Sequence, residues 1–389
     1  MRTLTRTKEL EAFCKAAAKH AYVTIDTEFL RERTYYSKLC LIQLASPGKG
    51  DEDAVLVDVL SDNLKLDPLF ALFKDESVVK VFHAARQDLE IFFFEGGVFP
   101  KPFFDTQVAA MVCGFGEQVG YETLVRRIAK KTVDKSSRFT DWSRRPLSEK
   151  QQKYALADVT HLREIYEFLA ARIKKTKRVK WVEEELELLT DPATYVIHPE
   201  EAWKRVKTRT NSGKFLAIVR ELAKFREAYA QDKNVPRSRI YKDDALLELA
   251  SSRPTSLADL GKTRLLLRDA RKGAIADGII KSVKAGLECL EADYPAPPPA
   301  RVRMSGNEGL ADLLRVLLKS QAEAAGVAPK LIATASELDE IAAGGEDLPA
   351  LKGWRRDVFG EAAQKLCAGK IALSADGSAV KLVELPQTG

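Results

Sequence analysis

The chain has 389 residues, of which 45% are hydrophobic. This length predicts about two or three domains, with enough apolar surface to form cores without disulfides or structural metal ions. Lys and Arg number 62 against 56 Asp and Glu, which gives a net charge of +6. So mild an excess is compatible with a nucleic-acid partner but does not require one.

The five cysteines are scattered, with no CxxC pair and no cysteine–histidine cluster. This spacing argues against a disulfide framework or a zinc site and is typical of a reducing compartment. The first ten residues lack the apolar core of a secretory signal. No run of roughly 18 apolar residues predicts a membrane span. We therefore expect a cytoplasmic protein with no membrane partner, and we expect it to be a monomer.

The first part of the chain has the pattern of an α/β domain. Short runs rich in Val, Ile and Leu, each ended by polar or turn residues, predict strands at 21–29, 38–46, 54–59 and 78–83. The close spacing of the first three strands predicts an antiparallel meander. Helical periodicity follows, with a short helix from Asp88 and a long helix that begins after Ser148 and runs to about Lys174.

From Thr210 onward the pattern is almost wholly helical, after a connector at 183–207 that contains two prolines. A polar, proline-rich stretch at 294–299 divides this half into two parts that end similarly. In the first part we predict a last helix at about 265–290. We read the two parts as related helical modules of roughly 80 residues. The predicted domains are 1–207, 208–293 and 300–389.

The strongest local signal for chemistry is the run Val23-Thr24-Ile25-Asp26-Thr27-Glu28-Phe29. Side chains alternate between the two faces of a strand, so Asp26 and Glu28 point the same way. Two neighbouring carboxylates repel each other unless a cation lies between them or water reaches them. Taken alone, this pair fits an exposed strand end better than a metal site.

Two helices contribute further candidates. Asp88 begins a predicted helix, where free N–H groups stabilise a carboxylate, so a plain helix cap is the favoured explanation when this residue is taken alone. Tyr154 and Asp158 are four residues apart on the long helix and can address one point in space. The simpler interpretation of this pair is a core tyrosine and an exposed acid.

Considered together, the four carboxylates predict a site for divalent cations. Oxygen ligands without His or Cys suit Mg²⁺ or Mn²⁺, and four carboxylates can balance two divalent charges. Two such ions about 4 Å apart stabilise both the attacking and the leaving oxygen of a phosphodiester. Tyr154 could then orient the attacking water. The set therefore predicts metal-assisted hydrolysis without a covalent intermediate.

The order Asp26-x-Glu28, Asp88 and Tyr154-x-x-x-Asp158 resembles the DEDD exonuclease superfamily, and Tyr154 matches its tyrosine subgroup. A closer similarity, to the ribonuclease D family, covers the segments 25–36, 39–45, 141–147 and 191–193. The two helical modules resemble HRDC domains. The resemblance spans nearly the whole chain and is most specific in its first part.

The resemblance implies a ribonuclease H-like α/β exonuclease domain, a mixed sheet flanked by helices, followed by two all-α HRDC-like modules. It implies a 3′→5′ exoribonuclease that releases nucleoside monophosphates from RNA with a free 3′ end, including tRNA precursors. It makes Asp26, Glu28, Asp88 and Asp158 the ligands of two divalent cations, Mg²⁺ or Mn²⁺. It makes Tyr154 the residue that positions water.

Four weaker candidates for substrate binding are Thr27, His83, Arg144 and Arg145. The resemblance suggests a contact between the backbone of Thr27 and the terminal nucleotide. His83 stands where proofreading exonucleases usually carry Asn, and it is equally a pocket residue or a structural histidine at a strand end. Arg144 and Arg145 lie in a predicted loop, and arginine suits phosphate.

Two other functions stay open. The four acids do not distinguish RNA from DNA, so a DNA-directed 3′→5′ exonuclease is the main alternative. A non-catalytic nucleic-acid-binding scaffold is the second, although all four acids and Tyr154 are present. Basic residues after glycine turns favour RNA binding by the helical modules, against the simpler interpretation of solvated helix faces. On that view, a fragment ending near Lys207 keeps its activity on short oligonucleotides.

Overall fold

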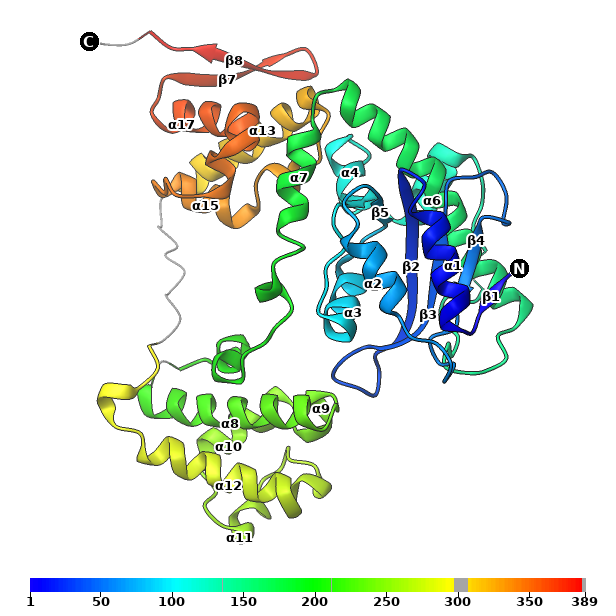
Figure 1. Ribbon diagram of the computed structural model, residues 1–389. Helices are drawn as coiled ribbons and strands as arrows, with labels where there is room; N and C mark the ends of the chain where they lie inside the picture. Colours follow the sequence, from blue (N-terminus) through cyan, green and yellow to red (C-terminus); the bar gives the residue numbers. More distant parts are fainter. Residues whose placement is uncertain (135, 211, 297–306, 387–389) are drawn as a thin grey trace.

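The computed structural model describes residues 1–134, 136–210, 212–296 and 307–386. A six-stranded mixed sheet, in the order β1-β4-β3-β2-β5-β6, lies at the centre of the N-terminal α/β domain (Figure 1). Strands β2, β3 and β4 form the predicted antiparallel meander, and β5 and β6 continue the sheet as parallel strands. The bounds are β1 Thr3–Leu4, β2 Tyr22–Leu30, β3 Lys38–Ala45, β4 Ala54–Val57, β5 Val79–Phe82 and β6 Phe103–Asp105.

Strand β2 is paired unequally on its two sides. Strand β3 pairs with it from Thr24 to Leu30, with a β-bulge between Glu28 and Phe29. Strand β5 pairs with it only over Tyr22–Thr24. The edge of β2 beyond Thr24 is therefore open on the β5 side, where a side chain from a neighbouring helix can approach it.

Helices cover both faces of this sheet. Helices α1 (Thr7–Ala17), α2 (Asp67–Lys74) and α3 (Arg86–Gly96) share one hydrophobic core with Val23 and Ile25 of β2. Helix α6 (Glu149–Lys175) covers the opposite face, where it packs on Leu41 and Ala45 of β3. Alternation along β2 thus turns Ile25 and Thr27 toward α3, and Asp26 and Glu28 toward α6.

Helix α6 begins and ends close to the predicted positions. Ser148 is its N-cap, as predicted: the hydroxyl accepts a hydrogen bond from the backbone N–H of Gln151, and the Gln151 side chain accepts one from the backbone N–H of Ser148. This capping box satisfies two N–H groups that a helix start otherwise leaves unpaired. The helix ends at Lys175, one residue beyond the predicted end.

The first helical module has a hydrophobic core of its own. Its longer helices are α8 (Gly213–Asp232), α10 (Asp243–Ser252) and α12 (Gly273–Glu288), joined by the short α9 (Arg237–Ile240) and α11 (Leu257–Leu260). The helix predicted at 265–290 starts later than expected. Gly273 has a φ of +62°, a left-handed conformation that a continuous α-helix does not allow. Between residue 265 and Gly273 the chain therefore forms only a 3-10 turn, η4 (Arg268–Arg271).

The second helical module differs from the all-α expectation. Helices α13 (Glu308–Ala325), α15 (Ala335–Ala342) and α17 (Glu361–Cys367) are followed by an antiparallel hairpin of β7 (Ile371–Asp376) and β8 (Ala379–Glu384). The segment alternates apolar and polar residues and has Gly377 at its turn, with a φ of +59°, which is a strand signal rather than a helical one. The predicted boundary at 300 and the prolines at 297–299 lie outside the described residues.

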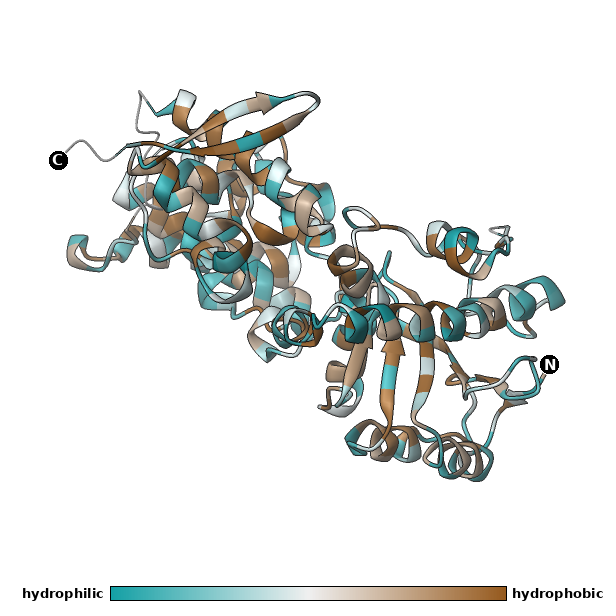
Figure 2. Ribbon diagram, turned by 90° about the horizontal axis from the view of Figure 1, so that it is seen from above, coloured by the Kyte–Doolittle hydropathy of each residue, from teal (hydrophilic) through white to brown (hydrophobic). Residues whose placement is uncertain are grey.

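The second module is continuous with the α/β domain in its packing. One hydrophobic core contains Val125 and Ile165 of the α/β domain together with Leu314 and Leu317 of α13. In Figure 2, hydrophobic residues (brown) alternate with polar ones along the helices and strands of both parts. Helix α7 (Val179–Glu187), which overlaps the predicted connector, lies between them (Figure 1). The two modules are therefore attached differently, one with a separate core and one with a shared core.

Contacts from α7 hold the second module in place. Trp181 stacks on Trp354 with ring centroids 4.5 Å apart. Arg355 of the module forms an ion pair with Glu185. Arg178 donates hydrogen bonds to the carbonyls of Val112 in the α/β domain and Ala325 in the module.

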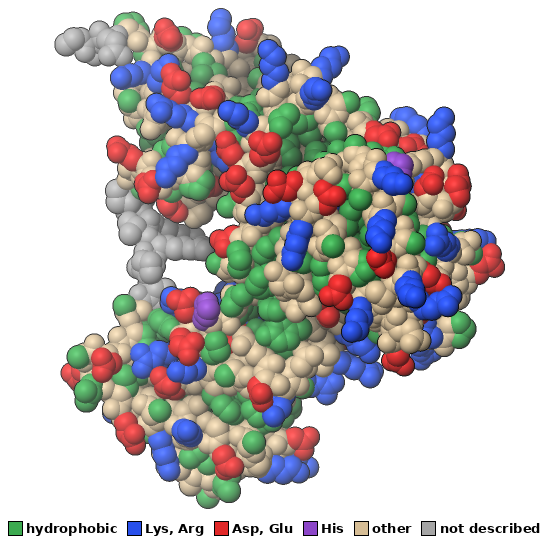
Figure 3. Space-filling model, viewed as in Figure 1, with side chains coloured by type: hydrophobic (Ala, Val, Ile, Leu, Met, Phe, Trp, Pro, Cys, Tyr) green, Lys and Arg blue, Asp and Glu red, His purple; other side chains and the backbone are tan. Residues whose placement is uncertain are grey.

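The surface carries charges of both signs. On the face shown in Figure 3, acidic and basic side chains are interspersed. In the described part of the chain, no helix is both long and apolar enough to cross a membrane.

Candidate active site

Three of the predicted acids meet between β2 and α6. Asp26, Glu28 and Asp158 each contribute a carboxylate oxygen to a group in which these atoms lie within 4.8 Å of one another. Strand alternation brings the first two together, and α6 supplies the third. The Thr24 hydroxyl fixes the helix against the strand by donating a 2.8 Å hydrogen bond to the carbonyl of Val159, next to Asp158.

The fourth acid approaches from the other side of β2. Asp88 lies in the first turn of α3 and is buried, at 6% exposure. Its carboxylate accepts a 2.5 Å hydrogen bond from the Thr27 hydroxyl, across the open edge of the strand. The charge of Asp88 raises the pKa of Glu28, and the charge of Asp26 raises the pKa of Asp88. The structure thus brings the four predicted acids together as a group of three with a fourth beside them.

The four carboxylates are held in an environment that disfavours their charged forms. Burial raises the pKa of each of them, and the charges of neighbouring acids add to the shift for Asp26, Glu28 and Asp88. In the regions that the structure describes, none of them forms an ion pair with Lys or Arg. Such a donor set, all oxygen and without an ion-pair partner among the described residues, fits divalent metal cations.

Tyr154 lies one helical turn before Asp158, on the same face of α6. Its hydroxyl interacts with the Asp158 carboxylate and lowers the pKa of that acid, against the larger effect of burial. Burial and the charges of Asp158 and Glu28 raise the pKa of Tyr154, so the hydroxyl keeps its proton at neutral pH. Trp142 packs beside the ring, with centroids 6.0 Å apart. Tyr154 therefore presents a protonated hydroxyl to the acidic group.

Of the predicted substrate contacts, Thr27 touches the acids directly, whereas His83 contacts residues of other elements. Thr27 is buried, and its hydroxyl is engaged with Asp88. His83 directly follows β5; its Nδ1 lies 2.9 Å from the Thr106 hydroxyl and its ring 5.5 Å from that of Tyr121. Burial lowers the pKa of His83, so the ring is neutral at pH 7.

The two predicted loop arginines make other contacts. Arg144 is exposed, and its Nε lies 3.4 Å from the Asp141 carboxylate. Arg145 donates to both carboxylate oxygens of Asp58, at 2.8 and 2.7 Å, and to the carbonyl of Cys40 at 2.7 Å. These hydrogen bonds tie the loop before α6 to the meander, and the substrate contact of Arg145 stays a prediction.

Two residues near the acids were not among the predicted site residues. The Arg138 guanidinium lowers the pKa of both Glu28 and Asp158, so it is a positive charge that faces the site. Gln43 is paired with Asp26 across the β2–β3 ladder and is fully buried. Neither polar atom of its side chain has a partner among the described residues. A glutamine inside an apolar strand is the one signal that pointed to this position.

Comparison with known proteins agrees with this geometry. Residues 1–174 match the 3'-5' exonuclease family and residues 215–272 match the HRDC domain. A ribonuclease D from Jannaschia sp. is 62% identical over 98% of this chain and 99% of its own length. The chain belongs to the ribonuclease D family. A second member, from Nitrobacter hamburgensis, is 46% identical over 99% of this chain and 100% of its own length.

The structure of Escherichia coli RNase D superposes with a TM-score of 0.82, at 28% identity, over 95% of this chain and 98% of that one. These similarities confirm the predicted ribonuclease D family and its fold, a mixed sheet with flanking helices followed by a helical HRDC region. They also confirm the predicted enzyme class, a 3′→5′ exoribonuclease.

Proposed function

We propose that this ribonuclease D-family chain hydrolyses RNA from the 3′ end with two divalent cations, Mg²⁺ or Mn²⁺. The observation that carries the proposal is the group of three carboxylates within 4.8 Å, with Asp88 beside it. The four acids would together hold the two ions, and Asp26, Glu28 and Asp158 lie near enough to one another to contact the same ion. When bound, the ions would activate water and stabilise the charge that develops on the phosphate.

The surrounding residues have distinct tasks in this proposal. Thr27 positions Asp88 through their hydrogen bond. Tyr154, whose hydroxyl stays protonated beside Asp158, orients the attacking water. The Arg138 guanidinium offers a positive charge for the scissile phosphate on the α6 side. No covalent intermediate is needed, because the site holds ligands for metals and a residue to position water.

Replacing Tyr154 by Phe tests the water-positioning role. The ring and its contact with Trp142 are kept, so α6 should stay packed while the chemical step slows roughly 10²-fold, the scale of a misplaced reactant. Single-turnover rates separate this step from product release. Tyr22→Phe is the matched control, because it also removes one hydroxyl, which donates to Glu167 of α6. An unchanged rate for Tyr154→Phe would leave the tyrosine with a packing role only.

The physiological substrates in this proposal are structured RNAs with a free 3′ end, including tRNA precursors. The E. coli relative is described as an exoribonuclease involved in structured RNA processing. We assign catalysis to residues 1–207 and RNA handling to the modules at 208–293 and 300–389. The described cysteines are all free, which supports a place in the reducing cytoplasm.

Digestion of end-labelled RNA and DNA of one sequence, with Mg²⁺ or with EDTA, tests the function. We expect mononucleotides to be released one at a time from RNA with a 3′-hydroxyl, and no release with EDTA, because the acids then lack their cations. RNA with a 3′-phosphate and circular RNA should resist. Equal rates on DNA would favour the DNA-directed alternative, and rapid cutting of circular RNA would contradict an exonuclease.

A further inference from the structure

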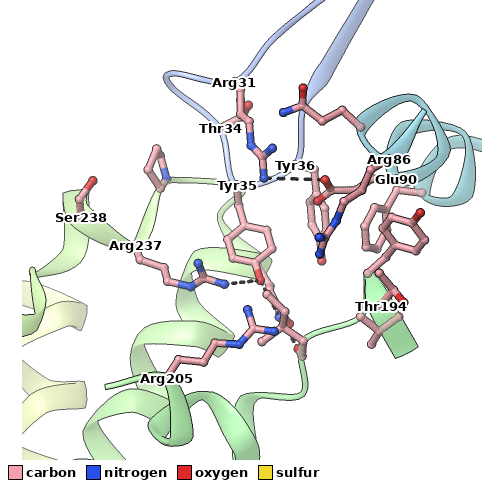
Figure 4. A pocket seen from close by; sticks show the side chains of 17 residues that line it. Arg31, Thr34, Tyr35, Tyr36, Arg86, Glu90, Thr194, Arg205, Arg237 and Ser238 are labelled. Carbon is pink, nitrogen blue, oxygen red and sulfur yellow. Dashed lines mark hydrogen bonds and ion pairs between the residues drawn. The ribbon is translucent and has the colours of Figure 1, made fainter. Parts of the chain in front are cut away.

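A cavity of about 780 Å³ lies where the α/β domain meets the first helical module. Three parts of the chain form its walls: the loop after β2 together with α3, the segment 194–205, and the start of α9 with the end of α8 (Figure 4). The lining is polar and basic for the most part, which is unlike the cores on either side.

The cavity adjoins the acidic site through the two elements that carry the acids. Strand β2 bears Glu28 and leads directly into the loop that contributes Arg31. In the first turn of α3, Asp88 points to Thr27, whereas Arg86 and Gln87 are exposed and line the cavity. An RNA strand that leaves the acids along α3 therefore enters this cavity.

Four arginines from the three parts line the cavity (Figure 4). Two of them are neutralised: Arg237 donates a 2.7 Å hydrogen bond to the carboxylate of Glu227, and Arg31 lies 3.7 Å from that of Glu90. The others, Arg86 and Arg205, are exposed and form no hydrogen bond or ion pair with any described residue. Two uncompensated guanidinium groups, from separate parts of the chain, thus face one space.

Aromatic and polar groups lie between these charges. The ring of Tyr36 packs against Phe94 at 4.6 Å and against Tyr35 at 4.8 Å, measured between centroids. The Thr34 hydroxyl is buried and has no partner within the described parts of the chain. Positive charge combined with aromatic surface is how proteins bind single-stranded nucleic acid without reading its sequence.

We propose that this cavity binds single-stranded RNA upstream of the 3′-terminal nucleotide, with Arg86 and Arg205 contacting phosphates. The proposal rests on the exoribonuclease function proposed above and adds a second subsite to it. Because Arg205 and Arg237 lie outside the α/β domain, the first helical module and its connector complete the subsite. Substrates with a single-stranded 3′ tail long enough to reach it should therefore be preferred over very short ones.

The test compares Arg86→Gln/Arg205→Gln with the control Arg33→Gln/Lys204→Gln. Both variants lose two positive charges, one from the loop after β2 or α3 and one from the segment 194–205, and neither Arg33 nor Lys204 lines the cavity. The value of kcat/KM is measured with Mg²⁺ on oligoribonucleotides of about 2 to 16 nucleotides, a range that spans the usual site sizes. Thermal unfolding of each variant verifies the fold.

For wild type and the control, we expect kcat/KM to rise with length and then level off. For Arg86→Gln/Arg205→Gln, the kcat/KM of the longest substrate divided by that of the shortest should fall about tenfold relative to wild type. The slope of log kcat/KM against log salt should fall by about 1.4, for two phosphate contacts on a single strand. A ratio equal to that of the control would overturn the subsite. The subsite would also be overturned if the double variant differed from the control only in losing inhibition by a free mononucleotide. That result would indicate a site for a mononucleotide. If wild type cleaved no RNA, the proposed function itself would fail.

Discussion

Asp26→Asn is expected to abolish measurable RNA hydrolysis and, at the same time, to stabilise the metal-free protein. Asp26 is one of the four acids that would hold the two cations, so its loss should cost several kcal/mol of transition-state stabilisation. Each ~1.4 kcal/mol is a tenfold loss of rate, so the decrease should be at least about 10³-fold. A rate near that of wild type at saturating Mg²⁺ would remove Asp26 from the mechanism.

The stabilisation follows from the raised pKa of Asp26, which burial and the charge of Asp158 cause. A carboxyl whose pKa is higher in the folded state destabilises the fold as pH rises above its unfolded pKa of about 3.9. The gain in Tm for Asp26→Asn should therefore be absent below about pH 4 and grow toward neutral pH. Added Mg²⁺ should raise the Tm of wild type more than that of the variant. Asp62→Asn, at an exposed position, is the control. It should change neither the rate of RNA hydrolysis nor the Tm of the metal-free protein.

Trp354→Ala is expected to destabilise the whole chain, including the α/β domain. Trp354 is 4% exposed and stacks on Trp181 of α7. Removal of a buried tryptophan side chain typically costs about 3–5 kcal/mol, a large part of the stability of a domain. Urea unfolding followed by circular dichroism measures the loss. Leu313→Ala, at a residue of α13 that is 45% exposed, should cost much less.

The shared core also changes the expectation for truncated chains. A fragment that ends near Lys207 would uncover Val125, Ile165 and their neighbours, which pack on the second module. We now expect this fragment to aggregate, although the sequence pattern suggested an active catalytic fragment. Recovery of a well-folded, active 1–207 fragment would contradict this inference. Deletion of residues 208–293 alone should be better tolerated, because the first module has a separate core.

The parts of the site that could be predicted are those set by local geometry. Strand alternation places Asp26 and Glu28 on one face, and a spacing of four residues places Tyr154 and Asp158 on one face of a helix. Both hold without knowledge of the tertiary structure. Asp88 could be proposed, but its hydrogen bond with Thr27 depends on β5 ending its pairing at Thr24. That is a property of the assembled sheet.

The parts that could not be predicted depend on contacts distant in sequence. Both helical modules have amphipathic helices, and their pattern does not reveal what covers each apolar face. The sequence therefore could not show that only the second shares a core with the α/β domain. Arg145 and Arg138 flank the same loop and look equivalent as basic residues. Only the position of Asp58 decides that Arg145 turns inward to a structural ion pair.

The β-bulge between β2 and β3, where Cys40 of β3 is passed over in the ladder, limits where this chain can change in length. Asp26 and Glu28 face α6 while Thr27 faces α3, so a shift of one residue along the ladder would exchange the two sets. A deletion between Tyr22 and Asp26 would send both acids into the apolar core under α1, α2 and α3. Beyond the bulge, Phe29 and Leu30 still pair with Leu39 and Lys38 of β3, in a register shifted by one residue. Insertions and deletions can therefore accumulate in the loop after Leu30 without moving the acids.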